Sequence, residues 1–388
     1  MAGSRNWADL PDEPTGLIAE RVLAYDVVDC LRFRAACPAW QRCSVDPRAH
    51  GSLDRRFHPW RWTMLREEHA VPTRRSILNT STGECVQVKI PQLLDHHALA
   101  LTPEGLLLLL DKPQRTAVRL LNPFTGQLTE LPPFNTLLPH IAHYQQRDDD
   151  DFARIMTAWG SGLADDGSTV VLYLRNHHLI GIAKPGDDRW SLLRLRDNML
   201  GKANIIFAGR FYCVTQDGVM VLQIDEGHPP RLEVAANLNM DVLLSVDYMH
   251  LVDNCGELML VHRQRRDKHS NPTNKFNMWR RRYDTYRVDL DSRTLIPVKS
   301  FGGKGRAVFM GMYCSFSVSI ESFPAGSVSA DTIYLSFDFG ETEYANVGAY
   351  HLTSGCLGRN SRRWGGLVPR PYTLVDCLSF SNTLEYSL

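Results

Sequence analysis

The chain has 388 residues, more than one small hydrophobic core can organise, so its length predicts a small domain beside a large one. Lys plus Arg and Asp plus Glu both number 43, so no net charge attracts nucleic acid or an anionic membrane surface. The first residues carry no apolar run of signal-peptide length, and the longest aliphatic run, residues 106–110, is far too short to span a bilayer, so we expect a cytoplasmic or nuclear protein without a membrane partner.

Residues 15–24 have the spacing of an amphipathic helix. Leu17, Ile18 and Val22 fall on one face of such a helix, and charged residues lie off that face. The pattern therefore predicts a first helix with these three side chains on its apolar side.

Two further helices are expected after it. Asp26 is a good N-cap, because its side chain can accept hydrogen bonds from the free backbone N–H groups of a helix from residue 27 to about 36. The spacing within that helix predicts buried side chains at Val28, Leu31 and Ala35. Pro38 ends the helix and can open a third one, since proline is tolerated at a first helical position and not in an interior. Trp40 would be the apolar anchor of that third helix.

Three helices of this size bury too little surface to be stable alone, so the segment needs a partner or a neighbouring domain. The segment resembles the F-box of plant F-box proteins, whose pattern begins Leu-Pro, continues with a hydrophobic pair, and ends in Cys, a basic residue, any residue and Trp. The matching positions are Leu10, Pro11, Ile18, Cys37 and Trp40.

This resemblance implies a Skp-type adaptor as partner and, through the adaptor, a cullin. The residues that would contact the adaptor are Leu10, Pro11, Leu17, Ile18, Val28, Leu31 and Trp40. Pro14 and Thr15 stand where the family has its hydrophobic pair, and Pro38 replaces the usual basic residue, which bears on adaptor affinity more than on the fold. The alternative from the residues alone is a plain helical cap on the following domain.

From Trp62 onward the pattern changes to short strands divided by turn residues. Val86, Val88 and Ile90 alternate with polar residues, the period-two signature of a strand with one buried face. The clearest unit consists of four strands joined by tight turns, at residues 97–101, 106–110, 117–121 and 128–131. Four such strands form one antiparallel sheet of the size of a propeller blade.

Weaker copies of this unit recur along the chain and bring the count to about six. The comparable strand pairs are 170–174 with 179–183, 211–215 with 219–224, 258–261 with 286–290, and 333–337 with 348–352. Outer strands at 190–195 and 295–298 follow two of these pairs, and residues 76–90 add a fragment of one more unit. We expect a closed propeller whose C-terminal strand, near residues 374–378, completes a blade begun by the N-terminal strands. A pair of packed β-sandwiches is the competing architecture.

The β-rich body also resembles the C-terminal domain of a large plant F-box family, abundant in grasses, whose propeller-like domain has no assigned function. The segments that carry this resemblance are residues 117–126 with 130–133, 286–290, and 330–335. The resemblance implies a non-catalytic substrate receptor of a Skp–cullin–F-box ubiquitin ligase, whose propeller holds a target protein. A propeller scaffold whose helices no longer engage an adaptor is the alternative.

The expected fold is therefore mainly β with a small α-helical N-terminal module. We assign residues 7–47 to the three-helix F-box, residues 48–75 to a linker with the strand that leads into the sheets, and residues 76–388 to a β-propeller of about six blades.

Signs of catalysis or metal binding are weak. The chain contains no Gly-x-Ser-x-Gly, phosphate-loop or His-Glu-x-x-His motif. Adjacent histidines at 96–97 and 177–178 would point to opposite faces of a strand, and residues 148–151 form a run of carboxylates typical of a solvated loop. The nine cysteines are scattered without a Cys-x-x-Cys pair, which indicates reduced thiols. We expect no catalytic residue, no metal and no cofactor.

A basic stretch between two expected strands is the candidate for target binding. Long loops on a rigid scaffold commonly carry binding residues, and this one combines arginine with aromatic side chains. The candidate residues are Arg265, Arg266, Phe276, Trp279 and Arg281. A solvated loop, a nuclear-import signal and a nucleic-acid contact remain as alternatives for the same composition.

Overall fold

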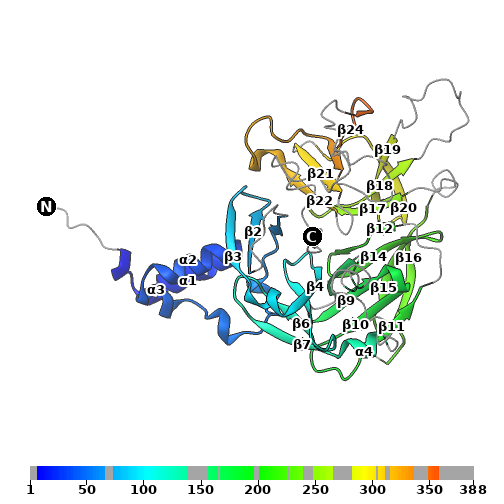
Figure 1. Ribbon diagram of the computed structural model, residues 1–388. Coiled ribbons are helices and arrows are strands. Elements are labelled where there is room, and N and C mark those ends of the chain that lie inside the picture. Colours follow the sequence, from blue (N-terminus) through cyan, green and yellow to red (C-terminus); the bar gives the residue numbers. More distant parts are fainter. Residues whose placement is uncertain are drawn as a thin grey trace, which may run out of the picture.

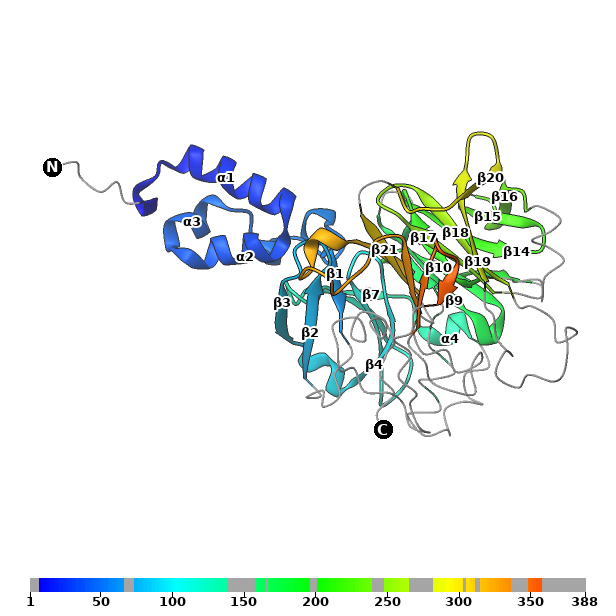
Figure 2. The same cartoon turned by 90° about the horizontal axis from the view of Figure 1, so that it is seen from above.

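Six β-sheets form a ring, and a helical module stands at its side next to the first sheet (Figure 1). The computed structural model describes residues 7–65, 73–138, 152, 156, 158, 160–164, 167–195, 201–225, 227–238, 248–264, 282–302, 305–310, 315–335 and 348–357. Seen from above, the module projects beyond the ring (Figure 2). The predicted class, a small helical module before a six-bladed β-propeller, is confirmed.

The helical module contains the three predicted α-helices with short 3-10 turns around them. Its elements are η1 (Trp7–Asp9), α1 (Asp12–Tyr25), α2 (Val27–Ala36), α3 (Pro38–Cys43), η2 (Pro47–Ala49) and η3 (Arg55–Phe57). Asp26 caps α2 as predicted, because its carboxylate accepts the N–H of Val28 at 2.7 Å. Pro38 is the first residue of α3, also as predicted.

The buried faces of the first two helices differ from the predicted ones. Helix α1 buries Thr15, Ala19 and Leu23, which recur every four residues, whereas Leu17 and Ile18 face outward. Helix α2 buries Val28, as predicted, together with Val27 and Cys30. Leu31 is only half-buried and Ala35 is exposed. The apolar residues of α1 are spread over two faces of the helix. Contact with the rest of the molecule buries the face that carries Ala19 and Leu23.

The six sheets follow one another along the chain, and we number them as blades 1 to 6. Blade 1 consists of β1 (Trp62–Met64), β2 (Arg74–Asn79) and β3 (Cys85–Lys89). Blade 2 consists of β4 (His96–Leu101), β5 (Leu107–Asp111), β6 (Val118–Leu121) and β7 (Leu128–Leu131). Blade 3 consists of β8 (Gly160–Ala164), β9 (Thr169–Leu174), β10 (Leu179–Ala183) and β11 (Ser191–Arg194).

The second half of the ring is less regular. Blade 4 consists of β13 (Ile205–Phe207), β14 (Arg210–Thr215), β15 (Gly218–Gln223) and β16 (Arg231–Ala236). Blade 5 consists of β12 (Gly201–Ala203), β17 (Tyr248–Asp253), β18 (Leu258–Gln264), β19 (Arg282–Asp289) and β20 (Thr294–Val298), in that order. Blade 6 has the order β22 (Ser315–Ser319), β21 (Arg306–Met310), β23 (Thr332–Leu335), β24 (Gly348–His351) and β25 (Cys356–Leu357). Short helical turns between strands are η4 (Pro91–Leu94), α4 (Phe134–Leu137), η6 (Arg175–His177) and η7 (Ile320–Ser322).

The hydrophobic core lies between neighbouring blades rather than in one central mass. Apolar clusters join blade 2 to blade 3, blade 3 to blade 4, blade 4 to blade 5 and blade 5 to blade 6. A further cluster joins blades 1 and 2. The ring closes because Leu78 of blade 1 packs with Ala307 and Phe309 of blade 6. The hydroxyl of Ser322 also donates to the carbonyl of Ser81 at 2.6 Å across this junction. The predicted C-terminal strand at 374–378 lies outside the described residues.

A five-residue turn repeats between the last two strands of blades 1 and 2. In blade 1 the side-chain oxygen of Asn79 accepts the N–H groups of the second and third residues after it, and Gly83 closes the turn at φ +75°. In blade 2 Asn122 and Gly126 do the same, with φ +73° at the glycine. Such Asx turns are local in origin, so the sequence alone can specify them.

Candidate functional site

The helical module exposes several apolar side chains. Trp7, Leu17 and Ile18 are 68%, 59% and 38% exposed. Pro11 is exposed and Leu10 is half-buried beside them. Large apolar groups left in water on one small module are typical of a surface that meets a partner.

Two of the predicted contact residues hold the module together, and a third borders a groove. Trp40 stacks on the ring of Phe33 with centroids 4.4 Å apart, and its Nε1 donates to the carbonyl of Trp7 at 3.3 Å. Val28 is only 7% exposed and packs against blade 1. Leu31 lines a groove of about 440 Å³ between α2 and α3. Val28 is therefore not presented to a partner, which a pattern of spacing could not reveal.

The neck between the helices and blade 1 is organised by the carboxylate of Asp26. One oxygen caps α2, and the other accepts Trp62 Nε1 at 2.8 Å and Asn79 Nδ2 at 3.1 Å. Asp26 is 8% exposed, so these bonds form away from water. Trp62 in turn packs edge-on against Phe124 of blade 2, with centroids 5.2 Å apart. The module is thus fixed to two blades.

His58 lies buried in the same neck and makes the stability of the protein depend on pH. Its Nε2 lies 3.0 Å from the carbonyl oxygen of Ser52, which can only accept, so Nε2 carries the proton. Its Nδ1 is buried and has no hydrogen-bond partner among the described residues. Burial therefore lowers the pKa of His58 from 6.5 to about 4.

We expect acid to weaken the wild-type protein more than a His58→Gln variant. Below pH 6.5 His58 is protonated in the unfolded chain but stays neutral in the folded protein. The free energy of unfolding therefore decreases as the pH falls towards 4. The full decrease in the free energy of unfolding is about 3 kcal/mol. Gln keeps a donor for Ser52 and does not titrate. Urea unfolding at pH 7 and pH 4.5 measures the difference, and identical pH dependence of the two proteins would contradict it.

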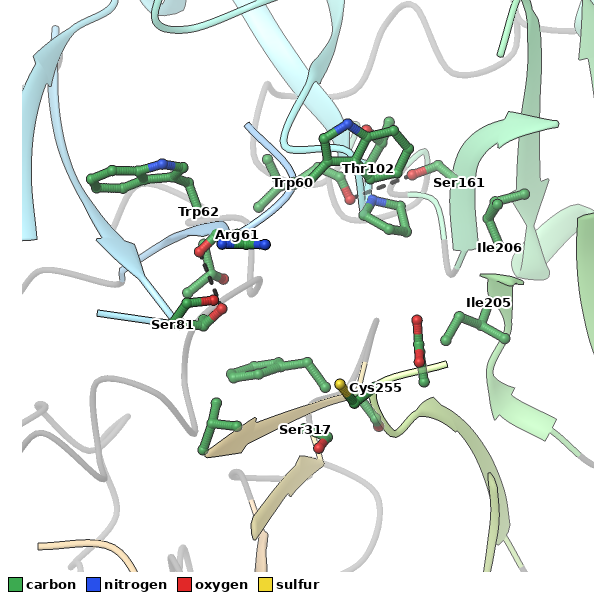
Figure 3. A pocket seen from close by; sticks show the side chains of 18 of the residues that line it. Trp60, Arg61, Trp62, Ser81, Thr102, Ser161, Ile205, Ile206, Cys255 and Ser317 are labelled. Atoms are coloured by element: carbon green, nitrogen blue, oxygen red, sulfur yellow. Dashed lines mark hydrogen bonds between the residues drawn. The ribbon is translucent and has the colours of Figure 1, made fainter. Parts of the chain in front are cut away.

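A cavity of about 900 Å³ is lined by residues from all six blades. We call it the mouth cavity. Arg61 and Trp62 stand on one side of it, Ile205 and Ile206 on another, and Ser317 on a third (Figure 3). Hydroxyl groups recur around the lining, at Thr63, Thr80, Ser81, Thr102, Ser161, Ser315, Ser317, Ser319 and Ser322. The lining is therefore polar and apolar in mixture, as in sites that recognise ligands by shape and hydrogen bonds.

A half-buried arginine is built into this lining. Arg306 Nε donates to Asn254 Oδ1 at 3.1 Å and to the hydroxyl of Ser317 at 2.7 Å, and its Nη2 donates to the Ser317 carbonyl at 3.2 Å. Asn254 is 3% exposed and is itself held by the carbonyl of Phe301 at 3.0 Å. All of these acceptors are neutral, so they orient the guanidinium without cancelling its charge.

A model of the KIB1-4 beta-propeller family matches residues 77–351, from β2 to the end of β24. That match covers well over half of the chain and all six blades. The chain belongs to the KIB1-4 beta-propeller family. No curated protein matches it.

Solved structures resemble this KIB1-4 propeller only remotely. Virginiamycin B lyase from Staphylococcus aureus is 12% identical, covers 71% of this chain and 72% of its own, and has a TM-score of 0.29. A putative 6-phosphogluconolactonase from Bacteroides fragilis is 11% identical, covers 78% of this chain and 95% of its own, and has a TM-score of 0.31. Likenesses at these TM-scores support no inference about activity.

The predicted target loop of the KIB1-4 propeller lies outside the described residues, as do Arg265, Arg266, Phe276, Trp279, Arg281 and the carboxylate run at 148–151. Target binding by that loop stays a prediction. Arg263, which borders it, is 4% exposed within β18.

Among the described residues, no three His, Cys, Asp or Glu side chains converge as metal ligands would. No helix in the described part of the chain has the length and apolar character needed to span a membrane.

Sequence reasoning missed the mouth cavity. Its lining comes in part from β8, which lacks an alternating pattern, and from the segment at 60–62 before the first full hairpin. One available signal was the row Ser315, Ser317 and Ser319, whose period of two places three hydroxyls on one face of a strand. A second signal was the run Trp60-Arg61-Trp62, whose large side chains fit neither a helical nor a strand pattern.

Proposed function

We propose that this protein is the substrate-recognition subunit of a Skp–cullin–F-box ubiquitin ligase. The helical module binds a Skp-type adaptor and through it a cullin, and the propeller binds a target protein. The protein itself performs no chemistry; it brings the target to the ligase. The site of action would be the cytoplasm or the nucleus.

The observation that carries this proposal is the exposed apolar surface of α1 on a module anchored to the propeller. Leu17 and Ile18 face away from the core, although a three-helix module of this size has few apolar groups to spare. The F-box-like pattern of Leu10, Pro11 and Trp40 covers the same module. The KIB1-4 propeller family is known from F-box-related proteins, which favours the same pairing.

Rigid attachment of the module also suits a receptor. The ion pair of Arg32 with Glu84 joins α2 to blade 1 at the surface, and the Asp26 bonds join them in the interior. A receptor must hold its target at a fixed distance from the adaptor, and a neck satisfied by directional hydrogen bonds does this better than a flexible linker.

Adaptor binding tests the proposal directly. In a pull-down with purified Skp-type adaptor, the double variant Leu17→Asp, Ile18→Asp should lose about a thousandfold in affinity, since two buried anchors that contribute about 2 kcal/mol each contribute about 4 kcal/mol together. Leu94→Asp is the matched control, because Leu94 is 51% exposed in η4, which follows blade 1 and contacts β4 of blade 2. Its affinity should equal that of the wild type.

The competing function is a propeller scaffold or binding protein that engages no adaptor. Pro14 and Thr15 favour it, because they replace the hydrophobic pair of the F-box pattern, and Thr15 is buried inside the module. Wild-type protein that fails to bind adaptor at micromolar concentration would establish the scaffold in place of the ligase subunit.

A further inference from the structure

We propose that the mouth cavity binds an extended peptide segment whose acidic side chain pairs with Arg306. The identification of that peptide as part of a ubiquitination target rests on the proposed function; the binding itself does not.

The guanidinium of Arg306 has no acidic partner among the described residues. Its three hydrogen bonds go to neutral oxygens of Asn254 and Ser317, and no carboxylate among the described residues forms an ion pair with it. Its Nη1 makes no hydrogen bond to a described residue. A half-buried, oriented guanidinium with donors to spare is suited to a carboxylate, which it can bind through two parallel bonds.

The carboxylates of the lining lie away from the buried part of the cavity. Asp253 and Glu321 also line the cavity, but both are exposed at its rim, where water screens their fields. Arg306 is the half-buried charge of the lining. The peptide that fits therefore presents an acid to Arg306 and carries no large net charge elsewhere, because the rim would repel a uniformly acidic segment.

The shape of the mouth cavity suits an extended chain more than a compact metabolite. The segment at 60–62 lines the mouth cavity and also a second cavity of about 480 Å³ against α1, here called the neck cavity. Trp60 is 48% exposed between the two cavities. An extended guest can cross this indole face and continue into the neck cavity, where Arg61 lies over the ring of Tyr25 at 5.2 Å.

The buried side chain of Asn204 favours a guest with peptide groups. Asn204 belongs to the lining, is 5% exposed, and has neither its side-chain oxygen nor its nitrogen paired with any described residue. An unpaired buried amide is costly, so the site gains when a guest satisfies it. A backbone peptide group offers the matching donor and acceptor once the Asn204 side chain turns towards the cavity.

The test uses the full-length protein and bead-displayed nonapeptide libraries that differ only at the central position, which is Glu, Gln or phosphoserine. Wild-type protein should recover Glu beads over Gln beads by about tenfold, the effect of one hydrogen-bonded charge. Arg306→Gln should reduce this ratio to about one. Arg231→Gln is the control, because Arg231 is an exposed arginine on blade 4 whose charge is already paired with Asp225 and Glu233.

A second variant protects the test against misfolding of Arg306→Gln. Ser81 is exposed at the mouth cavity and its side chain makes no hydrogen bond to a described residue, so Ser81→Trp should fill the opening without disturbing Arg306. It should keep its melting temperature and lose capture of Glu beads. Capture that survives Ser81→Trp, or a Glu preference that survives Arg306→Gln, would overturn the proposal.

Two further outcomes are decisive. Wild-type protein with no preference for Glu over Gln refutes the acidic peptide, and recovery of phosphoserine beads alone would assign the cavity to phosphopeptides instead. Adaptor pull-downs with the same variants separate this inference from the proposed function. Arg306→Gln and Ser81→Trp should bind adaptor like the wild type, whereas Leu17→Asp, Ile18→Asp should capture Glu beads normally.

Discussion

Replacing Asp26 with alanine is expected to lower the free energy of unfolding by about 3 to 5 kcal/mol, the usual effect of removing one partner from a buried, charged hydrogen-bond network. The loss has two parts. Helix α2 loses its N-cap, and the donors of Trp62 and Asn79 lose their acceptor in the interior of the neck. The second part is the larger one, because an unpaired buried donor costs more than a frayed helix end.

The matched variant Asp26→Asn separates the two parts. Asparagine caps a helix as well as aspartate does, but its amide nitrogen would face the donors of Trp62 and Asn79. We therefore expect an intermediate loss, with α2 intact by circular dichroism and faster proteolysis between the module and the propeller. Equilibrium urea unfolding gives the free energies. If Asp26→Asn were as stable as the wild type, the neck bonds would contribute nothing and the module would be held by packing alone.

Replacing Gly83 with alanine is expected to weaken the closure of the ring by about 2 to 4 kcal/mol, more than the same change at Gly126. Both glycines close the same Asx turn with nearly equal positive φ, so both alanine variants suffer the same backbone strain. A Cβ at Gly126 has open space around it. A Cβ at Gly83 would overlap the carbonyl oxygen of Ser322, which belongs to blade 6.

The difference between the two variants therefore isolates the junction of the first and last blades. Thermal and urea unfolding should show Gly126→Ala about 1 to 2 kcal/mol below the wild type and Gly83→Ala clearly lower. Size-exclusion chromatography should also show association of Gly83→Ala, since an opened ring exposes sheet edges. Equal losses at the two positions would mean that blades 1 and 6 do not press against each other in solution.

Much of the architecture follows from local sequence patterns. Blade 2 was predicted strand by strand, since its leucine-rich strands and its turns at Gly105 and Gly126 are specified by neighbours in sequence. The strand pairs at β9 with β10 and at β14 with β15 were found in the same way. The caps at Asp26 and Pro38 are local too. Because each such unit forms one sheet, their number along the chain predicts the six blades.

The strands around the axis were decided only by the tertiary structure. Strand β8 reads Gly-Ser-Gly-Leu-Ala and is buried at every position, so it shows no alternation to detect. Its small residues are required by the crowding of neighbouring blades: a Cβ at Gly162 would overlap Ile206 of blade 4, and one at Gly160 would lie 3.0 Å from Asn204. A glycine needed for close approach looks, in sequence, like a glycine that breaks a strand.

In the helical module, too, local patterns determine where the helices form, and tertiary contacts determine which of their side chains are exposed. The amphipathic spacing determined that α1 exists, but contact with the rest of the molecule decided that Leu23 is buried and Leu17 exposed. The candidate site at the mouth depends on the pairing of Arg306 with Asn254, 52 positions apart in the chain. Local patterns determine turns, caps and strands because their free energies arise between near neighbours. A cavity formed by six blades arises from contacts between distant residues, which only the closed ring brings together.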